Sequence, residues 1–250
     1  MKLLGDQALW EIELDYQSMI ENSKIVSIIS ARAGSKRIPG KNRLKFKDQS
    51  LVEWSIKFSL SCVNIKKTIL STDDKKIQDI SKYYQIFLHK RSKYLSGDTS
   101  SSFDLIKDIY FNFLNCNADI IILLQPTSPL REKDLLNKAF KLLNEENHWS
   151  SLIEVFPNVT FPAKIINGRW VPGLPEETRS QEIEPNYIPS GRLFIYNCKK
   201  TIEKNDPLGK RAIPLLTEEW KNINIDEEND LYKLSYVYDR LENQYSYLLD

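Results

Sequence analysis

The chain has 250 residues and a formal net charge of +1, with 41% hydrophobic and 28% charged residues. This composition is typical of a soluble globular protein with one sizeable core, and it excludes the strongly basic surface of a general nucleic-acid binder. Three well-separated cysteines, Cys62, Cys116 and Cys198, predict neither a disulfide framework nor a zinc site and fit a reducing compartment.

The first 22 residues place Leu9, Ile12, Tyr16 and Met19 at helical spacing, which predicts an amphipathic leader helix over 1–22. Acidic residues interrupt this segment, so it does not resemble a signal peptide, and no stretch approaches the roughly 20 apolar residues of a membrane span. We therefore expect a cytoplasmic protein. The leader is either part of this fold, the junction to a second domain, or a partner interface.

Strands and helices then alternate along the chain. Short apolar runs predict strands at 25–31, 68–71, 87–88 and 120–124, and the last is continuous enough to lie at the centre of a sheet. Apolar residues at helical spacing predict helices between and after these strands, at 52–63, 77–83, 103–113 and 135–143. Ser50 and Glu53 form a capping-box pattern at the start of the first of these helices.

The alternation breaks between Phe156 and Ser190, a stretch that contains six prolines and is expected to form an arm or insertion. The pattern then predicts a return to the sheet at 192–196, a last strand at 222–225 and a closing helix at 231–241. The fold class is therefore α/β, with a mostly parallel sheet covered on both faces. Such sheets bind ligands at the carboxyl ends of their strands, where the loops at 32–42, 72–75, 89–102 and 125–131 would gather.

The loop after the first strand is the most informative segment. Gly34 and Ser35 are small, and four cations fall within ten residues: Arg32, Lys36, Arg37 and Lys41. Small residues, backbone amides and cations together suit a polyphosphate. The loop is not a Walker A motif, because Asn42 stands where Ser or Thr would bind magnesium. A solvated basic turn is the alternative.

This loop, Ala31-Arg-Ala-Gly-Ser-Lys-Arg-Ile-Pro-Gly-Lys-Asn42, resembles the N-terminal signature of CMP-sialic acid synthetases (acylneuraminate cytidylyltransferases). Further matches follow in the family's order: Ser71-Thr-Asp-Asp74, Arg91 seven residues before Asp98-Thr-Ser-Ser-Ser102, and Leu124-Gln-Pro-Thr-Ser-Pro-Leu-Arg131. The resemblance covers roughly residues 24–240. It implies a Rossmann-like nucleotidyltransferase with a mostly parallel mixed sheet, and a homodimer in which the arm at 156–190 reaches over the partner's active site.

The reaction implied by the resemblance is attack by the anomeric hydroxyl of a keto-sugar acid on the α-phosphate of CTP, with magnesium present and pyrophosphate released. The domain at 23–250 would work by positioning and charge stabilisation. By resemblance, the catalytic residues are Arg32, Lys36, Lys41 and Gln125, and the nucleotide-binding residues are Ala31, Gly34, Ser35, Asn42, Arg91 and Ser102. His89 and His148 are expected to be bystanders, because this transfer needs no nucleophilic side chain.

The metal and sugar sites depart from the family pattern. Asp226 matches the second residue of the family's Asp-x-Asp pair, and Asn224 replaces the first, so we expect these two to hold Mg²⁺. Alternatively, Asp226 only caps the last helix. Lys164, Arg192 and Gln125 are predicted to hold the acid sugar, and Arg192 would replace the family arginine whose position is Ile188 here.

These departures put N-acetylneuraminic acid in doubt as the substrate, and a bacterial relative such as legionaminic or pseudaminic acid, or an unusual ulosonic acid, fits the sequence equally well. Two other readings stay open. One is a cytidylyltransferase for Kdo, a shorter keto-sugar acid. The other is a non-catalytic binding or regulatory protein on the same scaffold, which Asn224 and Ile188 motivate.

Overall fold

The structure, a computed structural model, describes residues 20, 22–146, 148–175 and 179–249. Nearly all of the predicted leader helix at 1–22 lies outside the described residues. Within them the chain builds a seven-stranded sheet in the order β11-β7-β10-β6-β1-β4-β5. None of the described helices is long and apolar enough to span a membrane.

One half of the sheet is parallel, as the alternating pattern predicts. β1 (Ile25–Ser30) lies between β4 (Ile65–Thr72) and β6 (Ile120–Leu124), and β4 also pairs with β5 (Phe87–Lys90). All five residues of β6 are buried and the strand lies fourth of seven, which confirms its predicted central position. The carboxyl ends of these strands point to one edge of the sheet.

The other half is mixed. β10 (Asn186–Asn197) runs antiparallel to β6 and to β7 (Ser151–Asn158), and β11 (Ala212–Leu216) pairs in parallel with β7. The predicted last strand at 222–225 is wrong, because this segment forms no strand and the sheet edge is β11. β11 is difficult to recognise from sequence because it contains Pro214 and lies half-exposed at the edge, where proline is tolerated.

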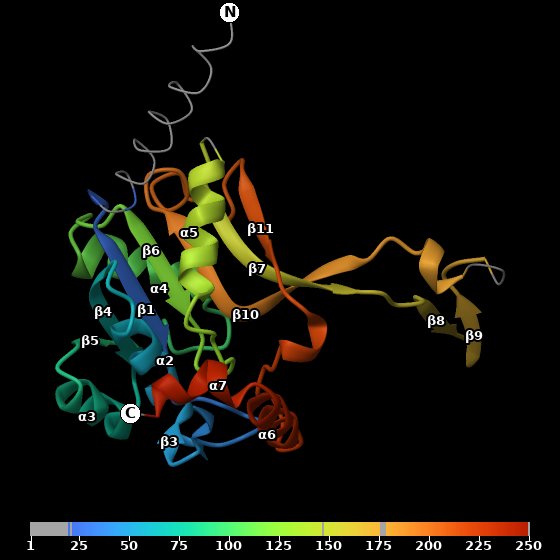
Figure 1. The fold of residues 1–250 in the computed structure, drawn as a ribbon, viewed down its shortest axis with the longest axis horizontal. Helices are drawn as coiled ribbons and strands as arrows, with labels where there is room; N and C mark the ends of the chain where they lie inside the picture. Colours follow the sequence, from blue (N-terminus) through green and yellow to red (C-terminus); the bar gives the residue numbers. More distant parts are fainter. Residues whose placement is uncertain (1–19, 21, 147, 176–178, 250) are drawn as a thin grey trace, which may run out of the picture.

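Helices cover both faces of the sheet (Figure 1). The apolar cluster that contains Ile25 and Ile29 packs against α2 (Leu51–Leu60), α5 (Leu135–Glu145) and α6 (Asp230–Arg240). The cluster on the other face contains Val26 and Ile28 and packs against α4 (Ser102–Asp108) and the π-helical turn η2 (Ile109–Phe113). Alternate residues of β1 thus feed opposite cores, as the two-residue repeat of a strand requires.

The remaining helices lie between or after these elements: α3 (Lys75–Tyr83), α7 (Glu242–Tyr245) and the short 3-10 turns η1 (Lys41–Arg43), η4 (Glu219–Lys221) and η5 (Ser246–Leu248). The predicted capping box is confirmed at Ser50 and Glu53, after the small hairpin β2 (Lys45–Phe46) and β3 (Gln49–Ser50). α5 begins at Leu135 after its N-cap residue Asp134.

The proline-rich segment projects from the body of the molecule. β7 and β10 run out of the sheet as a two-stranded ribbon that ends in the hairpin β8 (Ala163–Ile166) and β9 (Arg169–Pro172), followed by η3 (Ser180–Glu182) (Figure 1). Every residue of β8 and β9 is exposed. The segment predicted to form an arm or insertion therefore projects as a two-stranded ribbon.

Candidate functional site

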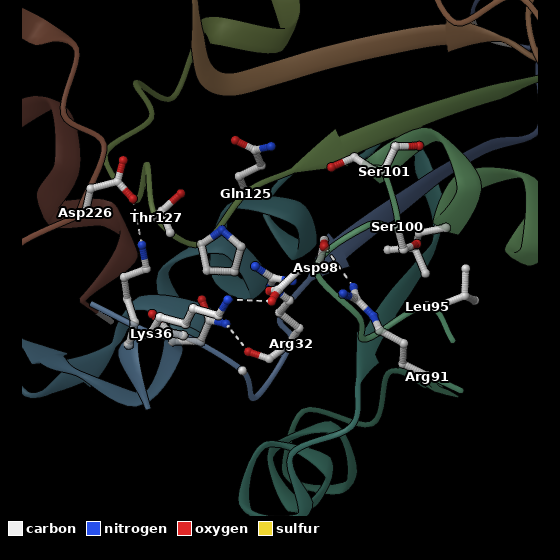
Figure 2. Close-up of a pocket in the computed structure, with 18 of the residues that line it drawn as sticks. Arg32, Lys36, Arg91, Leu95, Asp98, Ser100, Ser101, Gln125, Thr127 and Asp226 are labelled. Carbon is white, nitrogen blue, oxygen red and sulfur yellow. Dashed lines mark hydrogen bonds and ion pairs between the residues drawn. The ribbon is translucent and has the colours of Figure 1, made fainter. Parts of the chain in front are cut away.

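A cavity of about 470 Å³ opens where the carboxyl ends of the parallel strands meet (Figure 2). Its lining comes from the three loops that follow β1, β5 and β6, together with the segment before α6. This volume lies in the range of small-molecule and cofactor sites. Five cationic side chains and two carboxylates line it: Arg32, Lys36, Arg37, Lys41, Arg91, Asp98 and Asp226.

The four cations of the first loop share the two carboxylates. Lys36 Nζ lies 2.6 Å from Asp98 Oδ2, and Arg32 Nη1 lies 3.4 Å from Asp98 Oδ1. On the other side of the cavity, Lys41 Nζ and Arg37 Nη2 lie 2.9 and 3.1 Å from the same oxygen of Asp226. Hydrogen bonding to Lys36 holds the pKa of Asp98 below its usual value. The cavity therefore retains an excess of positive charge, which suits a polyanion.

Buried anchors hold the loop in place. Asn42 is 8% exposed and donates from Nδ2 to the Arg32 carbonyl at 2.9 Å, while the Ala33 amide donates to Asp73 Oδ1 at 2.7 Å. Gly40 has φ of +71°, a left-handed conformation that favours glycine. Asp73 lies within the Ser71–Asp74 match but was not predicted as a site residue. Its position directly after β4, beside the β1 loop, is the signal that could have found it.

Arg91 lies against the back of the cavity at the end of β5. Its Nη2 donates to Ser30 Oγ at 2.8 Å and its Nε to Ser71 Oγ at 3.3 Å, so two strands fix the guanidinium. Burial lowers the pKa of Arg91 to about 10, while Asp73 raises it and Arg32 lowers it. The group is thus a charged donor at neutral pH, held in a fixed direction.

The segment before α6 brings an acid to the cavity. Asp226 faces Lys41, and Asn224 Nδ2 donates to Asp226 Oδ2 at 3.0 Å. The backbone amides of Asp226 and Glu227 donate to Asp230 Oδ2, at 2.8 and 2.9 Å. Asp230 rather than Asp226 therefore satisfies the amides at this helix start, which leaves the Asp226 carboxylate available to a ligand.

Gln125 follows the central strand β6 and completes the lining with Pro126 and Thr127. Gly191 of β10 packs beside it with φ of +77°, and a Cβ there would lie 2.9 Å from Gln125 Oε1 and 2.8 Å from Ser128 Oγ. Only glycine allows this approach. The absence of a side chain at Gly191, in the Ile188-Pro-Ser-Gly191 segment, thus leaves room for the side chain of Gln125.

Comparison with known proteins identifies the family. The sequence pattern of the cytidylyltransferase family matches residues 26–165. The chain is 30% identical over 217 residues to the CMP-N,N'-diacetyllegionaminic acid synthase of Legionella pneumophila, covering 83% of this chain and 93% of that protein. It is 27% identical over 219 residues to the N-acylneuraminate cytidylyltransferase of Escherichia coli, covering 83% of this chain and half of that one. The chain belongs to the CMP-sialic acid synthetase family of cytidylyltransferases.

The fold agrees with this assignment. A solved CMP:2-keto-3-deoxy-manno-octonic acid synthetase in complex with CTP superimposes with a TM-score of 0.62 at 14% identity, covering 87% of this chain and 99% of that one. At this identity the likeness shows the Rossmann-like fold alone. The predicted fold class is confirmed for this cytidylyltransferase by its mostly parallel mixed sheet with flanking helices.

Most of the predicted site residues of this cytidylyltransferase meet in the one cavity. Those that line it are Arg32, Gly34, Ser35, Lys36, Lys41, Asn42, Arg91, Ser102, Gln125, Asn224 and Asp226. Ala31 does not line it, because its side chain is fully buried in the core below the loop. Lys164 lies on the exposed strand β8 of the arm and does not line the cavity of its own chain.

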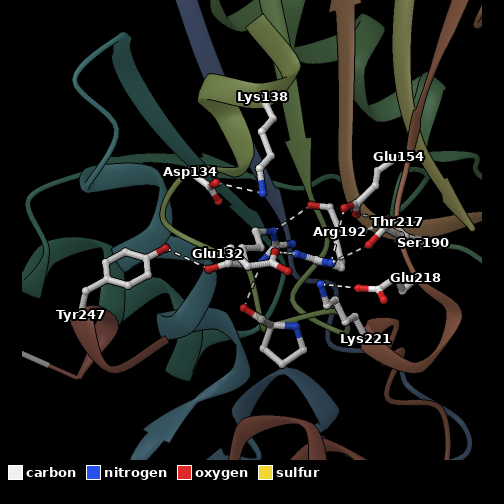
Figure 3. Close-up of polar contacts among 12 residues, drawn as sticks. Glu132, Asp134, Lys138, Glu154, Ser190, Arg192, Thr217, Glu218, Lys221 and Tyr247 are labelled. Atoms are coloured by element: carbon white, nitrogen blue, oxygen red, sulfur yellow. Dashed lines mark hydrogen bonds and ion pairs between the residues drawn. The ribbon is translucent and has the colours of Figure 1, made fainter. Parts of the chain in front are cut away.

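Arg192 requires a correction, because the structure does not bring it to the cavity (Figure 3). Its side chain is 1% exposed, its Nη2 pairs with Glu132, and its Nη1 lies 3.4 Å from Glu154 Oε1. The Arg192 carbonyl accepts from Nε of the equally buried Arg131 at 2.7 Å. Arg192 follows Gly191 in the part of β10 where the strand register shifts, and its side chain points into the interior rather than into the cavity.

Proposed function

We propose that this cytidylyltransferase moves CMP from CTP to the anomeric hydroxyl of a nonulosonic acid and releases pyrophosphate. The observation that carries the proposal is the single cavity in which four loop cations share two carboxylates. A polyphosphate is the ligand that matches this excess of positive charge. The family assignment and the named relatives support CTP as its source.

The chain's own residues would act by positioning and by charge. Arg32, Lys36 and Lys41 would hold the triphosphate and stabilise the charge that builds up as the hydroxyl oxygen attacks the α-phosphate and pyrophosphate departs. Arg91 and Asn42 would donate hydrogen bonds to the acceptor groups of cytosine. Gln125, between the phosphate loop and Gly191, would orient the acceptor sugar. Such alignment lowers the barrier without a covalent intermediate.

We also propose that Asp226 and Asn224 hold Mg²⁺. Asp226 offers a carboxylate inside the cavity, and the carboxamide oxygen of Asn224 is two residues away. This donor set fits Mg²⁺, which commonly takes one or two protein carboxylates and completes its shell with substrate oxygens and water. When bound, the ion would neutralise phosphate charge. Lys41, which now pairs with Asp226, would then be released toward the phosphates.

For the acceptor we propose N,N'-diacetyllegionaminic acid or a similar nonulosonic acid, ahead of N-acetylneuraminate. The similarity of this chain to the CMP-N,N'-diacetyllegionaminic acid synthase of Legionella pneumophila supports this choice. The replacement of the family arginine by Ile188 supports it as well, because it removes the cation that the family pattern places on the arm.

The exposed arm supports a homodimer. Large apolar side chains on the ribbon and its hairpin face solvent: Val159, Phe161, Ile165, Ile166, Trp170, Val171, Tyr187 and Ile188. Many exposed large apolar side chains on one projecting segment are characteristic of an interface. We propose that the arm crosses to a second copy of the chain and that Lys164 holds the sugar carboxylate in the partner's cavity. The three free cysteines fit a cytoplasmic location.

The direct test is pyrophosphate release from CTP with a panel of acceptors: diacetyllegionaminic, pseudaminic and N-acetylneuraminic acids and Kdo, with mass spectrometry of the product. We expect a CMP-nonulosonate, with Kdo a poor acceptor. Kdo as the best acceptor would reassign the substrate class. Binding of CTP without turnover on any acceptor would favour a binding protein on this scaffold.

Complementation tests the position of Lys164. Lys164→Ala and Lys36→Ala should each be nearly inactive, but mixed dimers of the two should regain activity, because one site then combines an intact phosphate loop with an intact arm. Light scattering should give twice the chain mass, and Trp170→Glu should weaken the dimer. Inactive mixed dimers would show that Lys164 does not act across the interface.

A further inference from the structure

A buried chain of polar side chains leads away from the cavity behind Arg91. Arg91 Nε lies 3.3 Å from Ser71 Oγ, Ser71 Oγ lies 2.9 Å from His89 Nδ1, and His89 Nε2 lies 3.0 Å from Asp108 Oδ2. Ser71 is fully buried and His89 is 8% exposed. The edge of the His89 ring packs against Phe113, with ring centroids 5.5 Å apart.

The donors and acceptors allow one consistent arrangement. A guanidinium only donates and a carboxylate only accepts, so Arg91 Nε–H donates to Ser71 and His89 Nε2–H donates to Asp108. A neutral imidazole that carries its proton on Nε2 presents a lone pair at Nδ1. The Ser71 hydroxyl therefore donates to His89 Nδ1, and its oxygen lone pairs remain free to accept from Arg91.

Serine, histidine and aspartate in this order resemble a hydrolase triad, but Ser71 cannot act as a nucleophile here. Its side chain has no exposed surface, and it does not line the cavity. Its oxygen instead faces Arg91, which does line the cavity (Figure 2). The chain of hydrogen bonds therefore ends at a ligand-binding guanidinium.

We propose that His89, oriented by Asp108, is a positioning residue for nucleotide selection: it sets the Ser71 hydroxyl as an acceptor for Arg91 and so directs the guanidinium toward the base of CTP. This inference rests on the proposed function of Arg91. It replaces the sequence reading of His89 as a bystander, because position along the sequence does not reveal the contact with Asp108. His89 does not touch the nucleotide itself.

Protonation of His89 would disturb this arrangement. The charged groups that face the imidazole are Asp108 on α4 and Arg91 at the end of β5, while Ser71 and Phe113 add no charge. Burial lowers the pKa of His89, Asp108 opposes that shift, and Arg91 adds to it. The ring is thus neutral at neutral pH. Below its pKa, Nδ1 becomes a donor, so Ser71 faces two donors and its own hydroxyl hydrogen loses its acceptor.

The first test needs no turnover. The chain has two histidines, so nitrogen NMR of the folded protein can resolve both rings. We expect His89 as the Nε2–H tautomer, with a pKa below the usual value of a histidine. An Nδ1–H tautomer for His89 would overturn the proposal, because Ser71 would then have to accept from the imidazole.

The second test compares the KM for CTP with the KM for UTP as the pH is changed. Both nucleotides carry the same triphosphate, so the titration of the triphosphate cancels in the ratio of the two KM values. His89→Leu should raise the KM for CTP about five- to tenfold and lower the CTP preference by a similar factor, with kcat within about twofold. His148→Gln is the matched control and should match the unaltered protein. Asp108→Asn, which can still accept from Nε2–H, should keep the preference at neutral pH and shift its loss on acidification to lower pH.

These outcomes separate the inference from the proposed function. Failure of the unaltered protein to bind CTP by calorimetry would overturn the proposed function. Tight CTP binding with an unchanged KM ratio in His89→Leu would overturn only the positioning role. If His89→Leu does not fold, the tautomer and the pH profile of Asp108→Asn decide the question on folded protein.

Discussion

Two regions of this cytidylyltransferase place cationic side chains beside carboxylates and use them in opposite ways. In the cavity, the side chains of Lys36 and Arg37 are 81% and 69% exposed, and their partners Asp98 and Asp226 are 56% and 35% exposed. In the interior, Arg192 and Glu154 are 1% and 2% exposed (Figure 3). The chemical groups are alike, so solvent and surrounding contacts decide what they do.

The carboxylate of each exposed pair can be replaced by another anion, because water screens these pairs and they contribute little to stability. A triphosphate can therefore displace Asp98 and Asp226 from the loop cations. The buried arginines, by contrast, keep fixed partners in the interior. Burial lowers the pKa of Arg192 to about 10, and burial together with Arg192 lowers that of Arg131 to about 9. Arg131 also donates from Nη2 to the Gln125 carbonyl at 2.9 Å, so the interior cluster supports the cavity wall.

The largest effect expected is at Asp226, the carboxylate that the cavity would use for chemistry. Asp226→Asn should lower kcat by about 10³-fold, because the proposed Mg²⁺ site loses the one carboxylate assigned to it. Chelation of divalent ions should abolish turnover in the unaltered protein. Asn224→Asp is the matched control and should keep or tighten the metal dependence. An enzyme that is indifferent to chelator would contradict the assignment.

Arg192→Leu tests the interior side of the comparison. It should lower the free energy of unfolding by about 3–5 kcal/mol, because the buried Glu154 and the partly buried Glu132 both lose the cation that they pair with. The KM for the sugar should stay unchanged in the folded protein. The double variant Arg192→Leu/Glu154→Leu should recover part of the lost stability. A raised sugar KM at unchanged stability would restore Arg192 to the sugar site, as the sequence alone predicted.

Lys36→Ala tests the exposed side. Turnover at saturating CTP should fall by about 10²-fold, since a donor to the developing phosphate charge is lost. The thermal unfolding temperature should stay the same, because the side chain projects into solvent. Lys93→Ala, a lysine that does not line the cavity, serves as the control. Near-normal turnover in Lys36→Ala would remove this residue from the mechanism.

The smallest effect is expected at Asp98. If this carboxylate only stands in for phosphate, Asp98→Asn should leave kcat within about threefold and leave the KM for CTP unchanged or lower, because exposed pairs cost little to break. The low pKa of Asp98, caused by Lys36, keeps the pair charged throughout the neutral range, so this comparison should not depend on pH there. A large loss of kcat would give Asp98 a direct role in transfer.

The sequence by itself determined the parallel half of the sheet and the identity of the cavity. β1, β6 and the capping box of α2 follow from local patterns, because burial on both faces, two-residue alternation and helix capping are all written in neighbouring residues. The cation-rich loop that lines the cavity was located for the same reason, since one short segment carries all four cations.

Only the tertiary structure decided which polar groups face the cavity. Arg192 points inward to Glu132 and Glu154, Asp73 holds the loop because β1 and β4 are neighbours, and His89 meets Asp108 across two elements. Each depends on contacts between segments far apart in the chain. The role of a cationic side chain depends on how deeply it is buried and on which carboxylate it pairs with. The order of residues along the sequence specifies neither.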